Sequence, residues 1–149
     1  MEELFEEAAS EFKRADHLFY VSLKYSRTGD VIMSLIDRLI SCIDKSMDVL
    51  FKFKEIKEIP PAPLPRANLI KQNFAEDKLI IKTMDLFFTM RKMIRSEKEA
   101  SNEFRRTLKV TIEMPDEDEP FILDIDTAQI YYDLVKKYLQ HIKEMISND

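Results

Sequence analysis

The apolar positions of residues 30–53 recur with the spacing of an α-helix and cover an unusually wide part of its surface. At roughly 100° per residue they span an arc of roughly 200°, about twice the width that seats one helix on a core. Polar side chains such as Asp37, Arg38 and Asp44 occupy the opposite side. We therefore expect a central helix with several neighbours. Its apolar positions are Ile32, Leu35, Ile36, Leu39, Ile40, Ile43, Met47, Leu50 and Phe51.

Residues 2–26 show a narrower helical stripe and predict a long amphipathic helix before the central one. Acidic residues fill its first turns, where the helix dipole favours them. The break at residues 26–29 is short, so we expect the two helices to be antiparallel, with Thr28 or Asp30 capping the second. The stripe consists of Leu4, Phe5, Ala8, Phe12, Ala15, Phe19 and Leu23.

Residues 59–66 hold four prolines, at positions 60, 61, 63 and 65. Proline disfavours helix and strand interiors, so this stretch predicts an extended connector across the end of a bundle; a docking peptide for an aromatic groove is the alternative. A third helix is expected over residues 73–95, with Asn73 and Glu76 forming a capping box; an earlier start near Asn68 is the alternative. The polar residues 96–106 fit either a loop or a frayed extension of that helix.

Alternating apolar and polar residues over 107–125, interrupted by the acidic stretch 115–120, predict a β-hairpin. Asp126 and Gln129 predict the cap of a last helix over residues 127–146, with Ile125 and Ile130 packing across it. This helix should bury Ile130, Tyr131, Leu134, Tyr138, Ile142 and Met145. The predicted fold is mainly α, an antiparallel four-helix bundle with one β-hairpin between helices 3 and 4, in a single domain of residues 1–149.

Composition fits a cytoplasmic protein that needs no disulfide. The chain has one cysteine, Cys42, one glycine, no targeting segment and no apolar run long enough to span a membrane. A net charge of −5 disfavours indiscriminate nucleic-acid binding, although a local basic face could still bind RNA.

A basic stripe on the first helix is the main candidate for a ligand-facing surface. Lys13, His17, Tyr20 and Lys24 fall on one line of the helix, and Arg14 lies beside them. Such side chains could hold phosphate or act as acid and base, but an exposed stripe of this kind also occurs simply as a solvated surface. If the stripe binds RNA, changing Lys13 and Lys24 to Glu should abolish salt-sensitive binding.

Other polar residues have both a structural and a functional interpretation. Arg105 and Arg106 precede the hairpin and could bind phosphate, or be neutralised by the acidic turn. His141, at the margin of the last helix's apolar stripe, could be a half-buried structural residue or an acid–base group. Three aspartates on the central helix could bind a cation or form a solvated face. They are Asp37, Asp44 and Asp48.

Several chemistries lack their motifs. The sequence has no Walker loop, GxGxxG, CxxC or HExxH, and neither histidine follows a glutamate by three residues as in di-iron bundles. Glu3 and Glu6 match half of the acidic motif of helical nucleotide pyrophosphatases, but Glu113 and Asp116, its nearest counterpart, fall at the hairpin turn. We expect no metal and no cofactor.

The predicted helices carry more apolar surface than a single bundle needs, which favours a homodimer; the alternative is a monomer in which the hairpin and the linker cover that surface. On the first helix Leu18, Val21 and Tyr25 lie outside the main stripe and are candidates for the dimer interface.

The order of helices, with a long first helix at residues 2–26, a short break and an equally long second helix, resembles the HEPN superfamily of small, commonly dimeric bundles. Its ribonucleases carry an Arg followed four to six residues later by His. This chain lacks such a pair, since Arg14 is only three residues before His17. The resemblance therefore implies a non-catalytic member that binds partners or nucleotides.

We expect a non-catalytic cytosolic interaction module that forms a homodimer and binds a protein partner or RNA. The alternative is an RNA- or nucleotide-processing enzyme of the HEPN type. In it His17 or His141 would act as the acid–base group, and Arg105 and Arg106 would hold phosphate.

Overall fold

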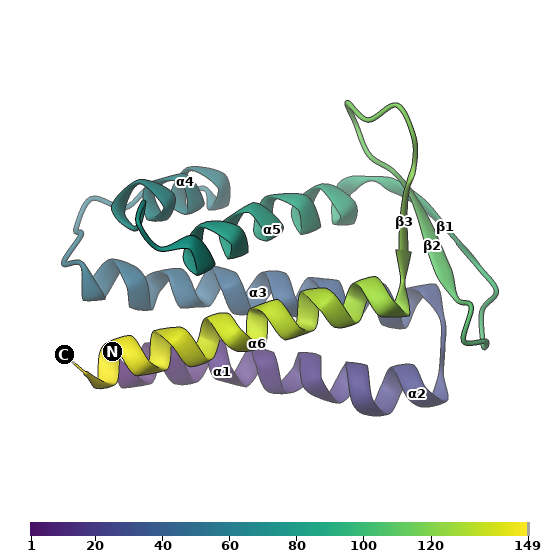
Figure 1. Ribbon diagram of the computed structural model, residues 1–149, viewed down its shortest axis with the longest axis horizontal. Coiled ribbons are helices and arrows are strands. Elements are labelled where there is room, and N and C mark those ends of the chain that lie inside the picture. Colours follow the sequence, from purple (N-terminus) through teal and green to yellow (C-terminus); the bar gives the residue numbers. More distant parts are fainter. Residues whose placement is uncertain (149) are drawn as a thin grey trace.

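The computed structural model describes residues 1–148 and shows five helices and a small antiparallel sheet (Figure 1). The first helix runs through α1 (Glu2–His17), a π-helical turn η1 (Leu18–Ser22) and α2 (Leu23–Tyr25). The later helices are α3 (Gly29–Phe53), α4 (Pro63–Asn73), α5 (Lys78–Arg95) and α6 (Ile125–Ser147). The strands are β1 (Glu97–Ser101), β2 (Lys109–Glu113) and β3 (Phe121–Asp124).

The long helices lie side by side, and the sheet stands at one end of them (Figure 1). The chain's N-terminus and the end of α6 lie together at the opposite end. As predicted, α1 and α3 are antiparallel neighbours. The molecule thus has a terminal end and a sheet end.

The central helix predicted from the sequence is confirmed as α3. It packs against α1, α4, α5 and α6, and it touches β1. Its N-cap is Thr28, whose Oγ1 accepts a hydrogen bond of 3.2 Å from the backbone N–H of Val31. All nine apolar positions of the predicted arc are buried.

The proline-rich connector was predicted too long, because α4 begins inside it. Pro63 and Pro65 fall in the first turn of α4, where backbone N–H groups have no partner within the helix. The first helical hydrogen bond of α4 comes from Arg66, which donates to the carbonyl of Ala62 at 3.1 Å. The prolines therefore start this additional helix, and the predicted count of four helices is wrong.

The helix predicted from Asn73 is also displaced. Asn73 ends α4, and α5 begins at Lys78 with Asp77 as its N-cap. Asp77 Oδ1 accepts from the Ile80 N–H at 3.1 Å, so the expected capping box of Asn73 and Glu76 does not form.

The predicted hairpin is part of a three-stranded sheet of order β1-β2-β3. β2 and β3 pair as expected, with Val110 opposite Leu123. The stretch predicted as a loop or frayed helix contains β1, which pairs antiparallel with β2 and places Ala100 opposite Val110. This strand shows no apolar alternation, because four of its five residues, Glu97–Ser101, are polar.

The start and the buried face of α6 differ from the prediction. Asp124 caps the helix, with its Oδ1 accepting from the Thr127 N–H at 2.8 Å, and Ile130 is 64% exposed. Tyr132 is buried instead, against Phe12 and Phe19 of the first helix. These contacts turn the helix so that Ala128, Tyr132, Val135, Tyr138, Leu139 and Ile142 face the core. Tyr131, Leu134 and Met145 are half-buried beside it.

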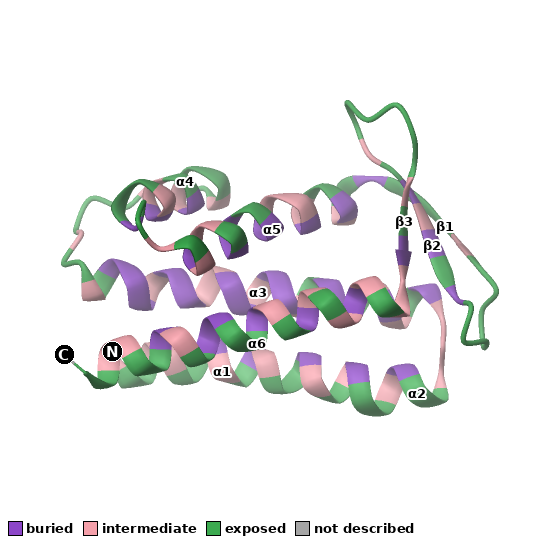
Figure 2. Ribbon diagram, in the orientation of Figure 1, coloured by how far each residue is buried: buried purple, intermediate pink, exposed green. Residues whose placement is uncertain are grey.

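The wide apolar surfaces of α3 and α5 are covered from within the chain (Figure 2). α4 and the sheet provide part of this cover, and neither α4 nor β1 was expected. The homodimer remains a prediction, but an uncovered apolar surface on α3 and α5 no longer supports it. Within residues 1–148, no helix combines the length and the apolar character needed to cross a bilayer.

Candidate functional site

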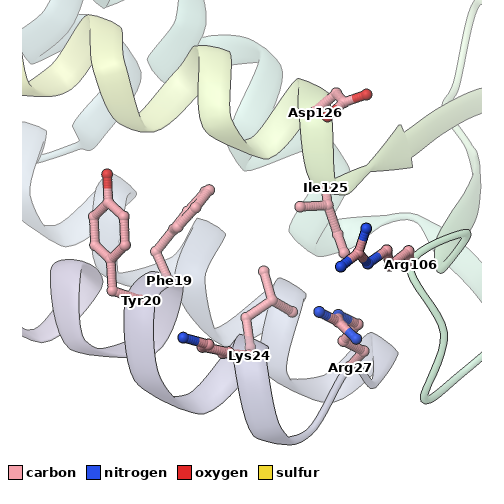
Figure 3. A pocket seen from close by; sticks show the side chains of 8 residues that line it. Phe19, Tyr20, Lys24, Arg27, Arg106, Ile125 and Asp126 are labelled. Carbon is pink, nitrogen blue, oxygen red and sulfur yellow. The ribbon is translucent and has the colours of Figure 1, made fainter.

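The clearest site is a cavity of about 360 Å³ at the sheet end (Figure 3). Three elements surround it: the end of the first helix, the start of α6 and the loop between β1 and β2. Basic and aromatic side chains dominate its walls. The lining residues are Phe19, Tyr20, Leu23, Lys24, Arg27, Arg106, Ile125 and Asp126. We call it the cationic pocket.

The π-helical turn η1 places Tyr20 and Lys24 in this pocket. A π turn adds one residue to a helical turn, so the side chains after it are rotated by about 100° relative to a continuous α-helix. Phe19 and Tyr20 belong to η1, and Lys24 follows in α2. Single π turns are rare and often occur at functional sites.

Packed aromatic rings form one wall of the pocket. The Tyr132 ring lies 5.2 Å from that of Phe19 and 5.6 Å from that of Tyr20, between ring centroids. The Tyr132 hydroxyl donates to the Asp16 carboxylate. Burial, together with this hydrogen bond, raises the pKa of Tyr132 far above its ordinary value.

The β1–β2 loop brings Arg106 to the pocket from a distant part of the sequence. The Phe104 N–H donates to the Arg27 carbonyl at 2.6 Å, and the Gly29 N–H donates to Glu103 Oε2 at 2.9 Å. Asn102 and Phe104 have positive φ angles of 56° and 66°. Such a conformation is unusual for a bulky residue, and here the two hydrogen bonds hold it in place.

The pocket carries excess positive charge. In the described part of the chain, Lys24, Arg27 and Arg106 form no ion pair within 4.0 Å. The carboxylate in the pocket, Asp126, projects away from both arginines (Figure 3). With three cations and one carboxylate, the cavity carries a net positive charge, which favours an anionic occupant.

The predicted basic stripe does not form one surface. Lys13, Arg14 and His17 line a separate cavity of about 520 Å³, together with Arg38 of α3. Arg14 and Arg38 share one counter-ion, the buried Glu11: its Oε2 accepts from Arg38 Nη1 at 3.1 Å, and its Oε1 lies 3.7 Å from Arg14 Nη1. Tyr20 lies within η1 and Lys24 after it, so both are rotated relative to Lys13, Arg14 and His17, and the five residues do not share one line.

The two histidines and Arg105 lie outside the cationic pocket. His141 is half-buried, as one interpretation proposed, and its Nε2 lies 2.6 Å from Oδ2 of Asp77. It follows Ile125 of the pocket by sixteen residues on the same helix, or about 24 Å. Arg105 is exposed beside Arg106.

The aspartates of α3 do not form a shared cation site. Arg66 of α4 bonds Asp48 at 2.9 Å and lies 4.0 Å from Asp44, whereas Asp37 lines a different part of the surface. Across residues 1–148, no group of three or more His, Cys, Asp or Glu side chains is placed to hold a metal ion.

The acidic loop, residues 115–120, does not neutralise the arginines of its own chain as the sequence suggested. It joins β2 to β3, whereas Arg105 and Arg106 lie in the β1–β2 loop at the other end of β2. A five-residue strand separates the two loops by roughly 17 Å. The acidic loop extends away from the helices on the opposite side of the sheet end (Figure 1).

Sequence reasoning found Tyr20, Lys24 and Arg106 but missed Arg27 and Phe19 as pocket residues. Phe19 was assigned to the core, where it is also largely buried. Arg27 lies in the break between helices, and no local pattern in the sequence indicates that the β1–β2 loop meets it there.

Compared with protein-family models, curated proteins and solved structures, the chain has no significant match. Its function must therefore be argued from the site itself.

Proposed function

We propose that this protein is a non-catalytic interaction module that acts as a homodimer through its sheet end. The observation that carries the proposal is the accumulation there of groups without partners. The cationic pocket holds three positive side chains and one carboxylate, and none of the three cations forms an ion pair in the described structure. The acidic loop holds four exposed carboxylate side chains, and none of them forms an ion pair in the described structure.

Exposed aromatic side chains at the same end support the proposal. Tyr25 is 81% exposed and Phe104 is 71% exposed, on segments joined by the hydrogen bond from Phe104 to Arg27. Val21 is 41% exposed one helical turn before Tyr25. Aromatic residues are typical anchors of protein interfaces. Of the three predicted interface residues, Leu18 is the poorest candidate, because it is half-buried against the core.

The alternative, an RNA- or nucleotide-processing enzyme of the HEPN type, lacks a convergent set of groups. His17 lines a different cavity from Arg106, and His141 lies about 24 Å from the pocket along α6. General acid–base catalysis needs such groups within hydrogen-bond reach of the same substrate. The arrangement therefore favours recognition over catalysis.

A cytosolic location fits the state of Cys42. Its thiol is buried in α3, and burial raises its pKa far above the ordinary value, an effect that Glu11 reinforces. A buried neutral thiol is chemically inert, and a structure with a single free cysteine does not depend on oxidising conditions.

Sedimentation equilibrium of the full chain tests the proposal. We expect the apparent mass to rise from the 17.7 kDa of one chain toward twice that value as concentration increases from about 1 to about 300 µM. Replacing Tyr25 and Phe104 with Ser should weaken association at least about tenfold. The matched control replaces Ile59 and Leu64, each 38% exposed and remote from the sheet, with Ser and should leave association unchanged. A single 17.7 kDa species throughout would overturn the proposal.

A further inference from the structure

We infer that the acidic loop of one copy binds in the cationic pocket of a second copy, and that the acidic loop of the second copy binds in the cationic pocket of the first. This inference rests on the proposed homodimer and names the two surfaces that meet. It thus assigns an occupant to the cationic pocket: a carboxylate-rich segment of the same protein.

The acidic loop is suited to insertion into a partner. Asp116, Glu117, Asp118 and Glu119 are all exposed. Pro115 and Pro120 flank them and restrict the backbone, which lowers the conformational entropy that binding must remove. The loop bears four negative charges within four residues, in a chain whose net charge is only −5. Its charge is therefore local and directed away from the body of the molecule.

The chemistry of the pocket matches that of the loop. Arg27 and Arg106 can each bind a carboxylate with two parallel hydrogen bonds, and Lys24 adds a third positive charge. Figure 3 shows both guanidinium groups directed into the space between α2 and the start of α6. An exposed apolar residue lies beside each of the two surfaces. Phe104 is two residues before Arg106 of the pocket, and Ile122, which is 44% exposed, is two residues after Pro120 of the acidic loop.

The two surfaces cannot meet within one chain, but they can meet between two. They lie on opposite sides of the same end of the molecule, separated by the length of β2 (Figure 1). If two copies face each other by their sheet ends, a twofold axis between them places each acidic loop opposite the other copy's pocket. Both contacts then form at once, and the assembly closes as a dimer instead of growing into a fibre.

Reciprocal charge reversal tests the inference. The pocket variant carries Arg27→Glu and Arg106→Glu, and the loop variant carries Glu117→Arg and Glu119→Arg. Alone, the pocket variant places introduced glutamates against the acidic loop at both contacts. The loop variant cancels the net charge of the loop and places two introduced arginines against the pocket cations at both contacts. We expect the dimer dissociation constant of either variant to rise at least about tenfold. An equimolar mixture restores opposite charges at both contacts and should form a heterodimer with an affinity close to that of the wild type.

Two control variants change net charge equally at remote exposed positions. Lys136→Glu with Lys137→Glu matches the pocket variant, and Glu6→Arg with Glu7→Arg matches the loop variant. Both controls should dimerise like the wild type. If a reversed variant fails to fold, the salt dependence of the wild type provides a second test. Its dissociation constant should rise severalfold between about 0.05 and about 0.5 M NaCl, and no change would overturn the inference.

The outcomes distinguish the inference from the proposed function. If the wild type is a dimer but both reversed variants dimerise equally well, the inference is wrong and the homodimer stands. If the wild type is monomeric, both fail. If the pocket variant keeps its dimer but loses binding to a single-stranded RNA that the wild type binds, the pocket serves RNA and the inference is overturned.

Discussion

Gly29 and Ala100 lie so close together that a Cβ atom on Gly29 would stand 2.7 Å from the Cβ of Ala100. Gly29 is the chain's only glycine, and it begins α3 where β1 crosses the helix. The same residue donates its N–H to Glu103, so the contact also anchors the β1–β2 loop. This close approach positions Arg106 at the cationic pocket.

Gly29→Ala should therefore destabilise the protein, although alanine is normally the better helix residue. Overpacking of this kind costs about 1–3 kcal/mol, which urea unfolding monitored by circular dichroism can measure. The double variant Gly29→Ala/Ala100→Gly removes the clash and should recover most of the loss. A single Gly29→Ala variant as stable as the wild type would show that β1 is not held against α3 as described.

The hydroxyls of Ser46 and Tyr138 lie 2.5 Å apart in the core and link α3 to α6. Ser46 also donates to the Ile43 carbonyl at 2.6 Å, so Tyr138 is the donor in the pair. Ser46→Ala leaves a buried phenol without a partner and should cost about 1–3 kcal/mol in unfolding free energy. Adding Tyr138→Phe to Ser46→Ala should remove much of that cost. Strictly additive losses would argue against the hydrogen bond.

Stability should fall at alkaline pH because three buried groups resist ionisation. Burial raises the pKa of Cys42, Tyr132 and Tyr138 above their ordinary values of 9.0 for Cys and 10.0 for Tyr. A group with a raised folded-state pKa contributes stability below its unfolded pKa, and that contribution is lost as pH rises past it. Urea unfolding should therefore show a stability that declines above about pH 9. Tyr138→Phe should make the decline above about pH 10 shallower; an unchanged slope would contradict the assignment to Tyr138.

Asp77 both caps α5 and contacts His141, so it joins the start of α5 to α6. Asp77→Ala should destabilise the protein by about 1–2 kcal/mol, whereas Asp77→Asn keeps an acceptor for the Ile80 N–H and should cost less. Asn73→Ala is the matched control, because Asn73 caps no helix and bonds only the Leu69 carbonyl on the surface. An equal loss in all three variants would contradict the capping role. Thermal or urea unfolding measures the ranking.

The elements with strong periodicity were predictable from the sequence. The first helix and α3 follow from repeated apolar spacing, and the Thr28 cap follows from a short break before a long helix. β2 and β3 follow from residues such as Val110 and Leu123, which alternate with polar neighbours. In each case the local pattern and the final environment agree.

The errors have separate physical causes. β1 is an edge strand of mostly polar residues, and it forms because β2 offers a partner. α4 begins with prolines, which remove no helical hydrogen bond when they lie in the first turn. The buried face of α6 is set by the aromatic packing of Tyr132, and the basic stripe is divided by a π turn. Helical periodicity predicts neither the aromatic contact nor the π turn. Three of the eight lining residues of the cationic pocket, Tyr20, Lys24 and Arg106, were therefore identified from the sequence, and the assembly of the pocket was not.

Isotope-filtered nuclear Overhauser spectroscopy tests the central claim most directly, on a dimer assembled from equal amounts of ¹³C,¹⁵N-labelled and unlabelled chains. Only contacts between copies give signals in this experiment. We predict intermolecular contacts between protons of the acidic loop or Ile122 and those of Lys24, Arg27 or Arg106. Intermolecular contacts confined to another surface, or none at concentrations where the wild type should be dimeric, would contradict the account.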